Sequence, residues 1–149
     1  MDVEKAIRDY LPNIVHMSLA TSVDGKPWVC EVHFVCDDDL NLYFRSLASR
    51  RHSQEISQNS QVAGNIVEQH DLTMAPRGLY FEGQAAMLTG LTEDSPEYLL
   101  FVDRFGKGRE ILEDAANPDG AQFYKITVSD WYMFDARESN PSQKYHLGR

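Results

Sequence analysis

Residues 14–46 read IVHMSLATSVDGKPWVCEVHFVCDDDLNLYFRS and carry the clearest structural pattern in the chain. From Trp28 to Phe34 every second residue is apolar, which is the period of a β-strand with one buried face. The dipeptide Asp24-Gly25 before this run is typical of a tight hairpin turn. We therefore expect this segment to form three antiparallel strands in a meander: residues 14–21, 27–34 and 40–46.

The rest of the chain predicts further short strands and a few helices. Helices are expected over residues 3–11, 49–59 and 96–105, and strands over residues 62–67, 79–88, 122–128 and 131–135. Ser49 is a plausible N-cap of its helix, and Gly83 inside a strand marks a bulge or a close approach. These elements predict a mainly β (α+β) fold, namely a closed antiparallel barrel with short flanking helices; a β-sandwich is the alternative.

Length and charge exclude several classes of protein. The 149 residues suit one domain over residues 1–149, in which we expect the polar tail 139–149 to be loosely ordered. The formal charge of −9 repels nucleic-acid backbones. No apolar run approaches the roughly 20 residues that span a bilayer, and the start does not resemble a signal peptide. We therefore expect a cytoplasmic protein that binds neither nucleic acid nor membrane.

The two cysteines, Cys30 and Cys36, are six residues apart within one expected run of strand. An extended chain would separate them by roughly 20 Å, too far for a disulfide bond. Their spacing is not that of a zinc site either. We therefore interpret both as small core residues and expect no metal site.

The strongest candidate for chemistry is the window Leu40–Gln54, which contains no acidic residue although the chain is acidic. Three arginines and two serines fall within it: Arg45, Ser46, Ser49, Arg50 and Arg51. Guanidinium groups, hydroxyl groups and the free N–H groups of a helix start can together bind a phosphate. The alternative from spacing alone is a solvated turn whose arginines pair with surface acids.

Other candidate residues are weaker. His33 lies opposite the core face of its strand and faces solvent or a groove, and His16 is similar. His52 could support the phosphate site or face water. Trp131-Tyr132 is more typical of core or interface than of a cofactor contact. No nucleophile elbow, Rossmann fingerprint or P-loop occurs, so the corresponding hydrolase and nucleotide-binding sites are excluded as far as motifs allow.

The order of several short motifs resembles the pyridoxamine 5′-phosphate oxidase-like FMN-binding split barrels. The similarity covers roughly residues 14–135, and its order and spacing are more specific than any single piece. The matching segments are residues 19–21, 24–27, 32–35, 42–46, 49–51, 59–63, 81–85, 124–127 and 131–132. The resemblance implies a six-stranded Greek-key split β-barrel and a homodimer with one FMN in each of two interface clefts.

The resemblance also implies roles for individual residues. Arg45 and Ser46 match positions near the phosphate and ribityl chain, and Ser49, Arg50 and Arg51 match a Ser-Arg-Lys phosphate clamp. His33 and Phe34 would lie along the flavin edge, and Trp131 would approach the flavin from the partner chain. The chain departs from the vitamin-pathway oxidase at Gly78, where that enzyme has glutamine, and lacks its C-terminal arginine–histidine motif, so vitamin B6 oxidation is not implied.

From these observations we expect an FMN-dependent oxidoreductase that uses NAD(P)H or another small reductant. No catalytic acid or base is assigned, because flavin chemistry needs mainly orientation and electrostatics from the protein. One alternative is a non-catalytic flavin-binding or sensor module. The other is the same barrel binding the deazaflavin F420 or haem, for which His33 and His146 are the candidate axial ligands. The substrate is not indicated by the sequence.

Overall fold

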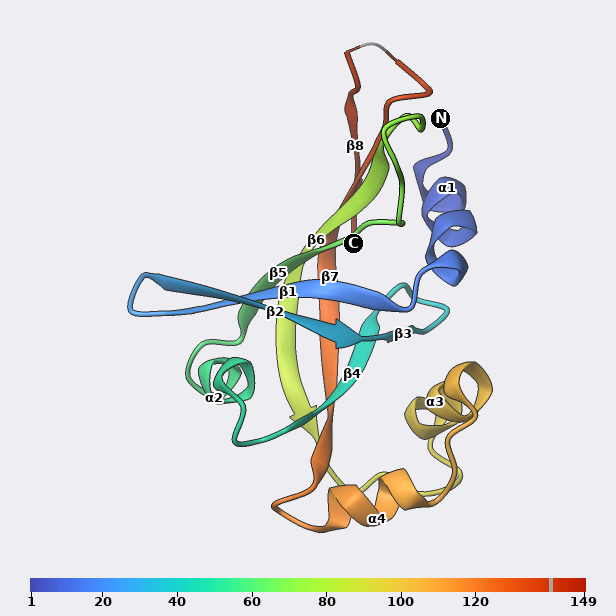
Figure 1. Ribbon diagram of the computed structural model, residues 1–149. Helices are drawn as coiled ribbons and strands as arrows, with labels where there is room; N and C mark the ends of the chain where they lie inside the picture. The colour runs from blue at the N-terminus through green and yellow to red at the C-terminus, as the bar shows by residue number, and fades with distance from the viewer. Residues whose placement is uncertain (140) are drawn as a thin grey trace.

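The computed structural model describes residues 1–139 and 141–149, and its strands form one antiparallel sheet (Figure 1). The strand order is β2-β1-β5-β6-β7-β4-β3, and β8 pairs with β7 beside this path. The strands are β1 (His16–Val23), β2 (Lys26–His33), β3 (Val35–Cys36), β4 (Leu42–Leu47), β5 (Gln61–Ile66), β6 (Arg77–Leu88), β7 (Ala121–Asp135) and β8 (Lys144–Gly148). The helices are α1 (Val3–Tyr10), the 3-10 turn η1 (Leu11–Asn13), α2 (Arg51–Gln58), α3 (Pro96–Phe105) and α4 (Glu110–Ala116).

The fold class agrees with the prediction: the chain is mainly β, with a curled antiparallel sheet that forms a half-barrel and a few short helices. The main path contains seven strands rather than six within the described part of the chain. Figure 1 shows β1 and β2 crossing β6 and β7 at a steep angle, as the twist of a strongly curled sheet requires. The curl brings β2, one end of the path, into contact with β4 near the other end.

Of the predicted three-stranded meander, the first hairpin is confirmed and the position of the third strand is wrong. β1 and β2 form the expected hairpin, and its turn places Asp24 and Gly25 at φ of 52° and 73°. The third strand forms no strand pairing with them, because β4 pairs with β7 and β3 at the far end of the path. The expected alternation already fails inside β2, where Trp28 and Val29 are both exposed. It fails again after β2, where Phe34 and Val35 are both 1% exposed and the chain leaves the first hairpin. Local alternation predicted strands but could not predict their partners.

Residues 122–135, expected as two strands, form the single strand β7. Its register against β6 shifts between Glu82 and Gly83, which pair with Asp130 and Val128, so Ser129 is the extra residue of a β-bulge. A Cβ atom at Gly83 would lie 2.4 Å from the Thr127 carbonyl oxygen, so the sheet needs glycine there. The predicted bulge or close approach at Gly83 is confirmed. Past this bulge the buried positions of β7 move from even to odd residue numbers, such as Trp131 and Met133.

Two apolar clusters stabilise the molecule. The larger one lies between the sheet and α1, and includes Ile7 and Tyr10 of the helix. The smaller one packs Tyr98 and Phe101 of α3 and Ile111 of α4 against the sheet. The sequence patterns predicted α1 and α3 but missed α4, whose single fully buried residue gives almost no periodic signal. Burial of such apolar side chains supplies about 25 cal/mol per Å² of the folding free energy.

Two boundary predictions are corrected. Residues 144–148, expected within a loosely ordered tail, pair with β7 as β8; Asn140 of that tail lies outside the described residues. Ser49 is not the N-cap of α2, because Arg50 occupies that position with φ −67° and ψ 148° and without a side-chain cap bond. Among the residues that the structure describes, none of the helices is long and apolar enough to cross a membrane.

Candidate functional site

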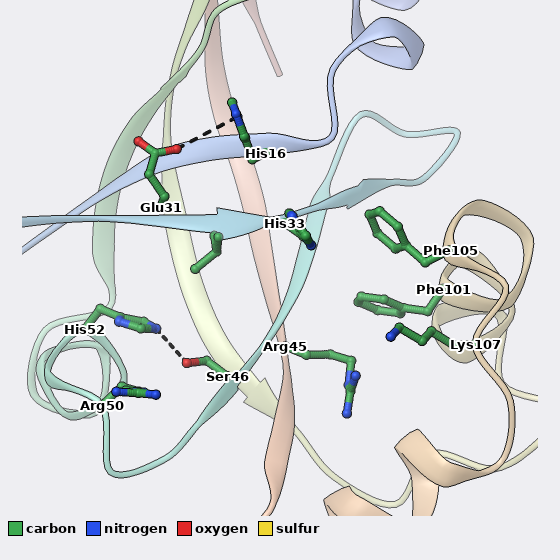
Figure 2. A pocket seen from close by; sticks show the side chains of 11 residues that line it. His16, Glu31, His33, Arg45, Ser46, Arg50, His52, Phe101, Phe105 and Lys107 are labelled. Atoms are coloured by element: carbon green, nitrogen blue, oxygen red, sulfur yellow. Dashed lines mark hydrogen bonds and ion pairs between the residues drawn. The ribbon is translucent and has the colours of Figure 1, made fainter.

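A cavity of about 680 Å³ opens between the curled sheet, the start of α2 and the end of α3 (Figure 2). Its volume lies within the range of small-molecule and cofactor sites. The sheet contributes residues from β1, β2 and β4, and the two helices contribute side chains from opposite sides. The lining residues are His16, Glu31, Val32, His33, Arg45, Ser46, Arg50, His52, Phe101, Phe105 and Lys107.

Positive charge dominates the wall formed by the end of β4 and the start of α2. Arg45 and Ser46 lie near the end of β4, and a turn closed by the Arg50 N–H and the Leu47 carbonyl (3.1 Å) brings Arg50 to the same cavity. Lys107 reaches the cavity from the loop after α3 (Figure 2). Glu31 is the only acidic residue in the lining, and its carboxylate accepts a hydrogen bond from Ser18. This wall therefore attracts anions although the chain as a whole is acidic.

Arg45 retains a free donor inside the protein. Its Nη2 donates to Asp114 Oδ2 at 3.1 Å, and its guanidinium lies over the Phe123 ring. Its Nε is buried without a hydrogen-bond partner among the described residues. A buried donor without a partner costs free energy, so an acceptor that reached this atom would be stabilised. Arg50, by contrast, is exposed and forms no ion pair within the described residues.

Ser46 and His52 form a hydrogen-bonded pair at the base of this wall. The Ser46 Oγ and His52 Nε2 atoms are 2.8 Å apart, and the dashed line in Figure 2 marks this contact. His52 is buried at 7% exposure and packs at a tilt against Phe44. Burial, and then the nearby Arg50 charge, lower the pKa of His52 below its ordinary value. The imidazole is therefore neutral near pH 7.

An aromatic wall closes the other side of the cavity. The His33 and Phe105 rings are stacked, with centroids 5.6 Å apart and planes inclined by 22°. Phe101 lies beside them on α3. His16 lies at the upper edge, where its Nδ1 is 3.9 Å from Glu31 Oε2. The cavity thus combines a basic wall with an aromatic wall, an arrangement that suits an anionic ligand carrying a flat ring.

The structure brings together four of the eight predicted site residues: His33, Arg45, Ser46 and Arg50. The remaining four do not line this cavity. Ser49 is exposed beside it, and Phe34 is 1% exposed and lines a smaller neighbouring cavity. Trp131 is 0% exposed and donates its Nε1–H to the Leu40 carbonyl at 3.3 Å. The expectation that Trp131 reaches a flavin from a partner chain is therefore wrong for this conformation.

Arg51, the second residue of the expected phosphate clamp, faces the β1–β2 hairpin instead. Its Nε donates to Glu55 Oε2 at 2.8 Å, and its guanidinium lies 4.2 Å from the centroid of the Trp28 ring. Thr21 donates to the other Glu55 oxygen, also at 2.8 Å. The bonds from Arg51 and then Thr21 lower the pKa of Glu55. Arg51 is therefore paired with a carboxylate and attaches α2 to the hairpin.

Seven lining residues were not predicted as site residues. Two of them, Glu31 and Val32, lie on β2 beside the predicted His33, and the sequence signals of the other five differ. His52 lies within the acid-free window and was noted as a possible support. His16 was noted as similar to His33. Phe101, Phe105 and Lys107 belong to α3 and its following loop, far along the chain from the basic window. Only the Gly-Lys-Gly sequence at 106–108 indicated an exposed cation there, and no local pattern placed it opposite Arg50.

The remaining histidines and the cysteines lie elsewhere. His146 pairs with Asp130 at 2.7 Å and stacks on Tyr132. Cys30 and Cys36 are free and half-buried, and burial raises the pKa of Cys30 to about 11 and that of Cys36 to about 12. Both thiols are therefore protonated near pH 7 and are weak nucleophiles. No cluster of three or more His, Cys, Asp or Glu side chains with metal-site geometry occurs in the described residues.

Comparison with known proteins gives the family. The model of the family described as pyridoxamine 5′-phosphate oxidase matches residues 3–135. The chain belongs to this family. No sequence match was found among curated proteins. The match covers every lining residue of the cavity, from His16 to Lys107.

Solved structures share the fold of this pyridoxamine 5′-phosphate oxidase family member. A heme binding protein from Mycobacterium smegmatis has a TM-score of 0.73 at 13% identity; the alignment covers 95% of this chain and 55% of the other. An FAD-binding protein from Mesorhizobium loti has a TM-score of 0.63 at 19% identity, and the alignment covers 88% of this chain and 91% of the other. The heme storage protein HutZ from Vibrio cholerae has a TM-score of 0.63 at 21% identity, and the alignment covers 85% of this chain and 89% of the other. At these identities the likeness shows the shared fold.

Proposed function

We propose that this chain is a flavoprotein that binds FMN in the cavity between β4, α2 and α3. The observation that carries the proposal is the basic wall of Arg45 and Arg50, which Lys107 faces from the α3 side, with the buried Arg45 Nε still lacking a partner within the described residues. A phosphate monoester supplies both the negative charge and the acceptor oxygens that such a wall favours. The aromatic wall on the opposite side, formed by His33 and Phe105, suits the flavin ring.

The residues present fit this cofactor in chemistry. Arg45, Ser46 and Arg50 would hold the phosphate, since a guanidinium can bind two phosphate oxygens at once. The stacked His33–Phe105 pair would exclude water from one side of the ring. Bound FMN would supply the electron-transfer chemistry itself. A protein of this kind needs no acid or base of its own to accept electrons from NAD(P)H or another small reductant.

A homodimer with the flavin between its subunits is part of the proposal. It is supported by membership in the family and by two exposed apolar residues of β2, since Trp28 and Val29 are 40% and 59% exposed. Sedimentation equilibrium with and without FMN measures the oligomeric state. A monomer at all concentrations would contradict this part.

Haem is the second candidate ligand. It is favoured by His33 in the cavity wall, by basic residues suited to propionates, and by structural neighbours that are a heme binding and a heme storage protein. Of the two candidate axial ligands only His33 lines the cavity. His146 lies on β8 and is paired with Asp130. Axial ligation by a histidine is common in haem proteins.

The visible spectrum of the freshly purified protein separates the two candidates. A flavin spectrum supports the proposal, and a Soret band that disappears in a His33→Ala variant supports haem. Anaerobic addition of NADPH to the flavin form then tests catalysis. Loss of the oxidised-flavin absorbance, followed by its return with oxygen, is the result expected of an oxidoreductase. An unchanged spectrum with each reductant tested favours the non-catalytic flavin module.

A further inference from the structure

The hydrogen bond between Ser46 and His52 has a direction, and this direction sets what Ser46 offers to the cavity. Ser46 lies near the end of β4 and His52 lies in the first turn of α2, so their contact joins the two elements that form the basic wall. The Oγ and Nε2 atoms are 2.8 Å apart, and both residues line the cavity (Figure 2). His52 is 7% exposed, so water competes weakly for its ring.

A neutral imidazole has two tautomers, and each gives Ser46 a different role. When the proton is on Nδ1, Nε2 accepts the Ser46 proton and only the lone pairs of Oγ remain for a ligand. When the proton is on Nε2, the ring donates to Ser46 and the hydroxyl proton is free to point into the cavity. Only the second arrangement makes Ser46 a donor to an anion.

The surrounding charges favour the second arrangement when an anion is bound. Arg45 on β4, Arg50 at the start of α2 and Lys107 after α3 are cations around the cavity. Glu31 on β2 is the only acid in the lining, and Asp114 of α4 pairs with Arg45 from outside it. His16 and His33 complete the titratable groups of the lining. An anion drawn in by the three cations needs donors from every neighbouring group. A serine that presented only lone pairs to it would be repelled.

We propose that His52 is a positioning residue that donates from Nε2 to Ser46 and thereby turns the Ser46 hydroxyl toward the anionic end of the ligand. The pair then selects phosphate monoesters over uncharged analogues. The identity of the ligand rests on the function proposed above, in which this anionic end is the FMN phosphate. The orientation of the pair applies equally to an inorganic anion.

The tautomer is measured directly by nitrogen NMR on protein labelled with ¹⁵N-histidine, in the presence of inorganic sulfate. Sulfate is a suitable probe because it does not titrate near neutral pH. A His52→Gln variant identifies the His52 signals by their absence. We expect the Nε2–H tautomer for His52. The Nδ1–H tautomer would overturn the proposal, whether or not the protein binds a flavin.

A double-mutant cycle on FMN affinity tests the route through Ser46. Ser46→Ala and His52→Phe should each weaken FMN binding by about tenfold to a hundredfold, the value of one bond to a charged group. The phenylalanine keeps an aromatic ring against Phe44. In the Ser46→Ala background, His52→Phe should have almost no further effect. Equal losses in both backgrounds would overturn the proposal, because His52 would then act independently of Ser46.

A conservative variant separates orientation from folding. His52→Gln retains a side-chain donor, so its FMN affinity should stay within about threefold of wild type. Loss of a neutral hydrogen bond would lower the affinity by more than this factor. Loss of affinity in a folded His52→Gln protein equal to that of His52→Phe would contradict the role of the donor. If wild type binds sulfate but not FMN, the proposed function fails while the NMR result still decides this inference.

Discussion

Arg50 and Arg51 are neighbours in the sequence but lie in two different regions around α2. On the pocket side, Arg50 lines the cavity with Ser46 and His52 and forms no ion pair within the described residues. On the hairpin side, Arg51 is held by Glu55 and covers the Trp28 ring. Glu55 and Thr21 extend this side to β1, where Thr21 and Trp28 are paired across the hairpin.

The difference between the two sides shows how to separate binding arginines from structural ones. In a chain with 23 acidic residues, most arginines find a carboxylate; Arg8, Arg45, Arg51, Arg77, Arg109 and Arg137 all do. Arg50 faces the cavity with no carboxylate partner within the described residues, so its donors remain for a ligand. Arg45 uses one donor on Asp114 and lines the same cavity with the rest of its guanidinium. The pocket side therefore binds, and the hairpin side attaches α2 to the sheet.

The largest expected effect tests a residue that the family resemblance placed at the flavin and the structure places in the core. Trp131→Ala should lower the free energy of unfolding by about 3–5 kcal/mol, because it leaves a large cavity. Trp131→Phe, which still folds, should leave FMN affinity unchanged. Urea unfolding and an FMN titration measure the two quantities. A loss of FMN affinity in folded Trp131→Phe would show that Trp131 contributes to FMN binding and would contradict its assignment to the core.

The comparison itself is tested by replacing the two arginines separately. Arg50→Ala should weaken FMN binding by about tenfold to a hundredfold, because it removes charge-assisted bonds to the phosphate. Arg51→Ala is the matched control, with the same change of charge at the next position. It should change FMN affinity by less than about threefold and lower the melting temperature instead. Equal effects of both variants on FMN affinity would end the distinction between the two sides.

The smallest expected effect concerns Glu55 and pH. The bonds from Arg51 and Thr21 lower the pKa of Glu55 below its ordinary value of 4.5. The folded state therefore binds this proton less readily than the unfolded state, so the contribution of Glu55 is present above pH 4.5 and is lost as the pH falls through the folded-state pKa. Thermal unfolding of wild type and Glu55→Gln should converge as the pH decreases. A constant difference between them down to pH 3 would contradict the assignment.

The sequence predicted the basic wall because its residues are local. Arg45, Ser46 and Arg50 fall within six positions, and a strand end followed by a tight turn and a helix start brings them together. The hairpin was equally predictable, since Asp24 and Gly25 both adopt the positive φ that this turn requires. What these patterns could not give was the side to which each arginine points, which depends on Glu55 and Trp28.

The remaining site residues depend on contacts between distant segments. Phe101, Phe105 and Lys107 reach the cavity only because α3 packs across β4 and β7, through contacts such as Phe101 with Phe123. The position of Trp131 depends on the bulge at Ser129, which exchanges the buried and exposed positions of β7. A one-residue shift of this kind turns every later side chain of the strand to the other face of the sheet, and no local sequence pattern predicts it.

The central claim, that the cavity recognises the phosphate of a flavin, is tested most directly by comparing FMN with riboflavin. The two ligands share the ring and the ribityl chain and differ only in the phosphate. Isothermal titration of wild-type protein should give FMN an affinity at least about a hundredfold higher, as expected for two or more charge-assisted bonds. Equal affinities for FMN and riboflavin, or no binding of either, would contradict the account.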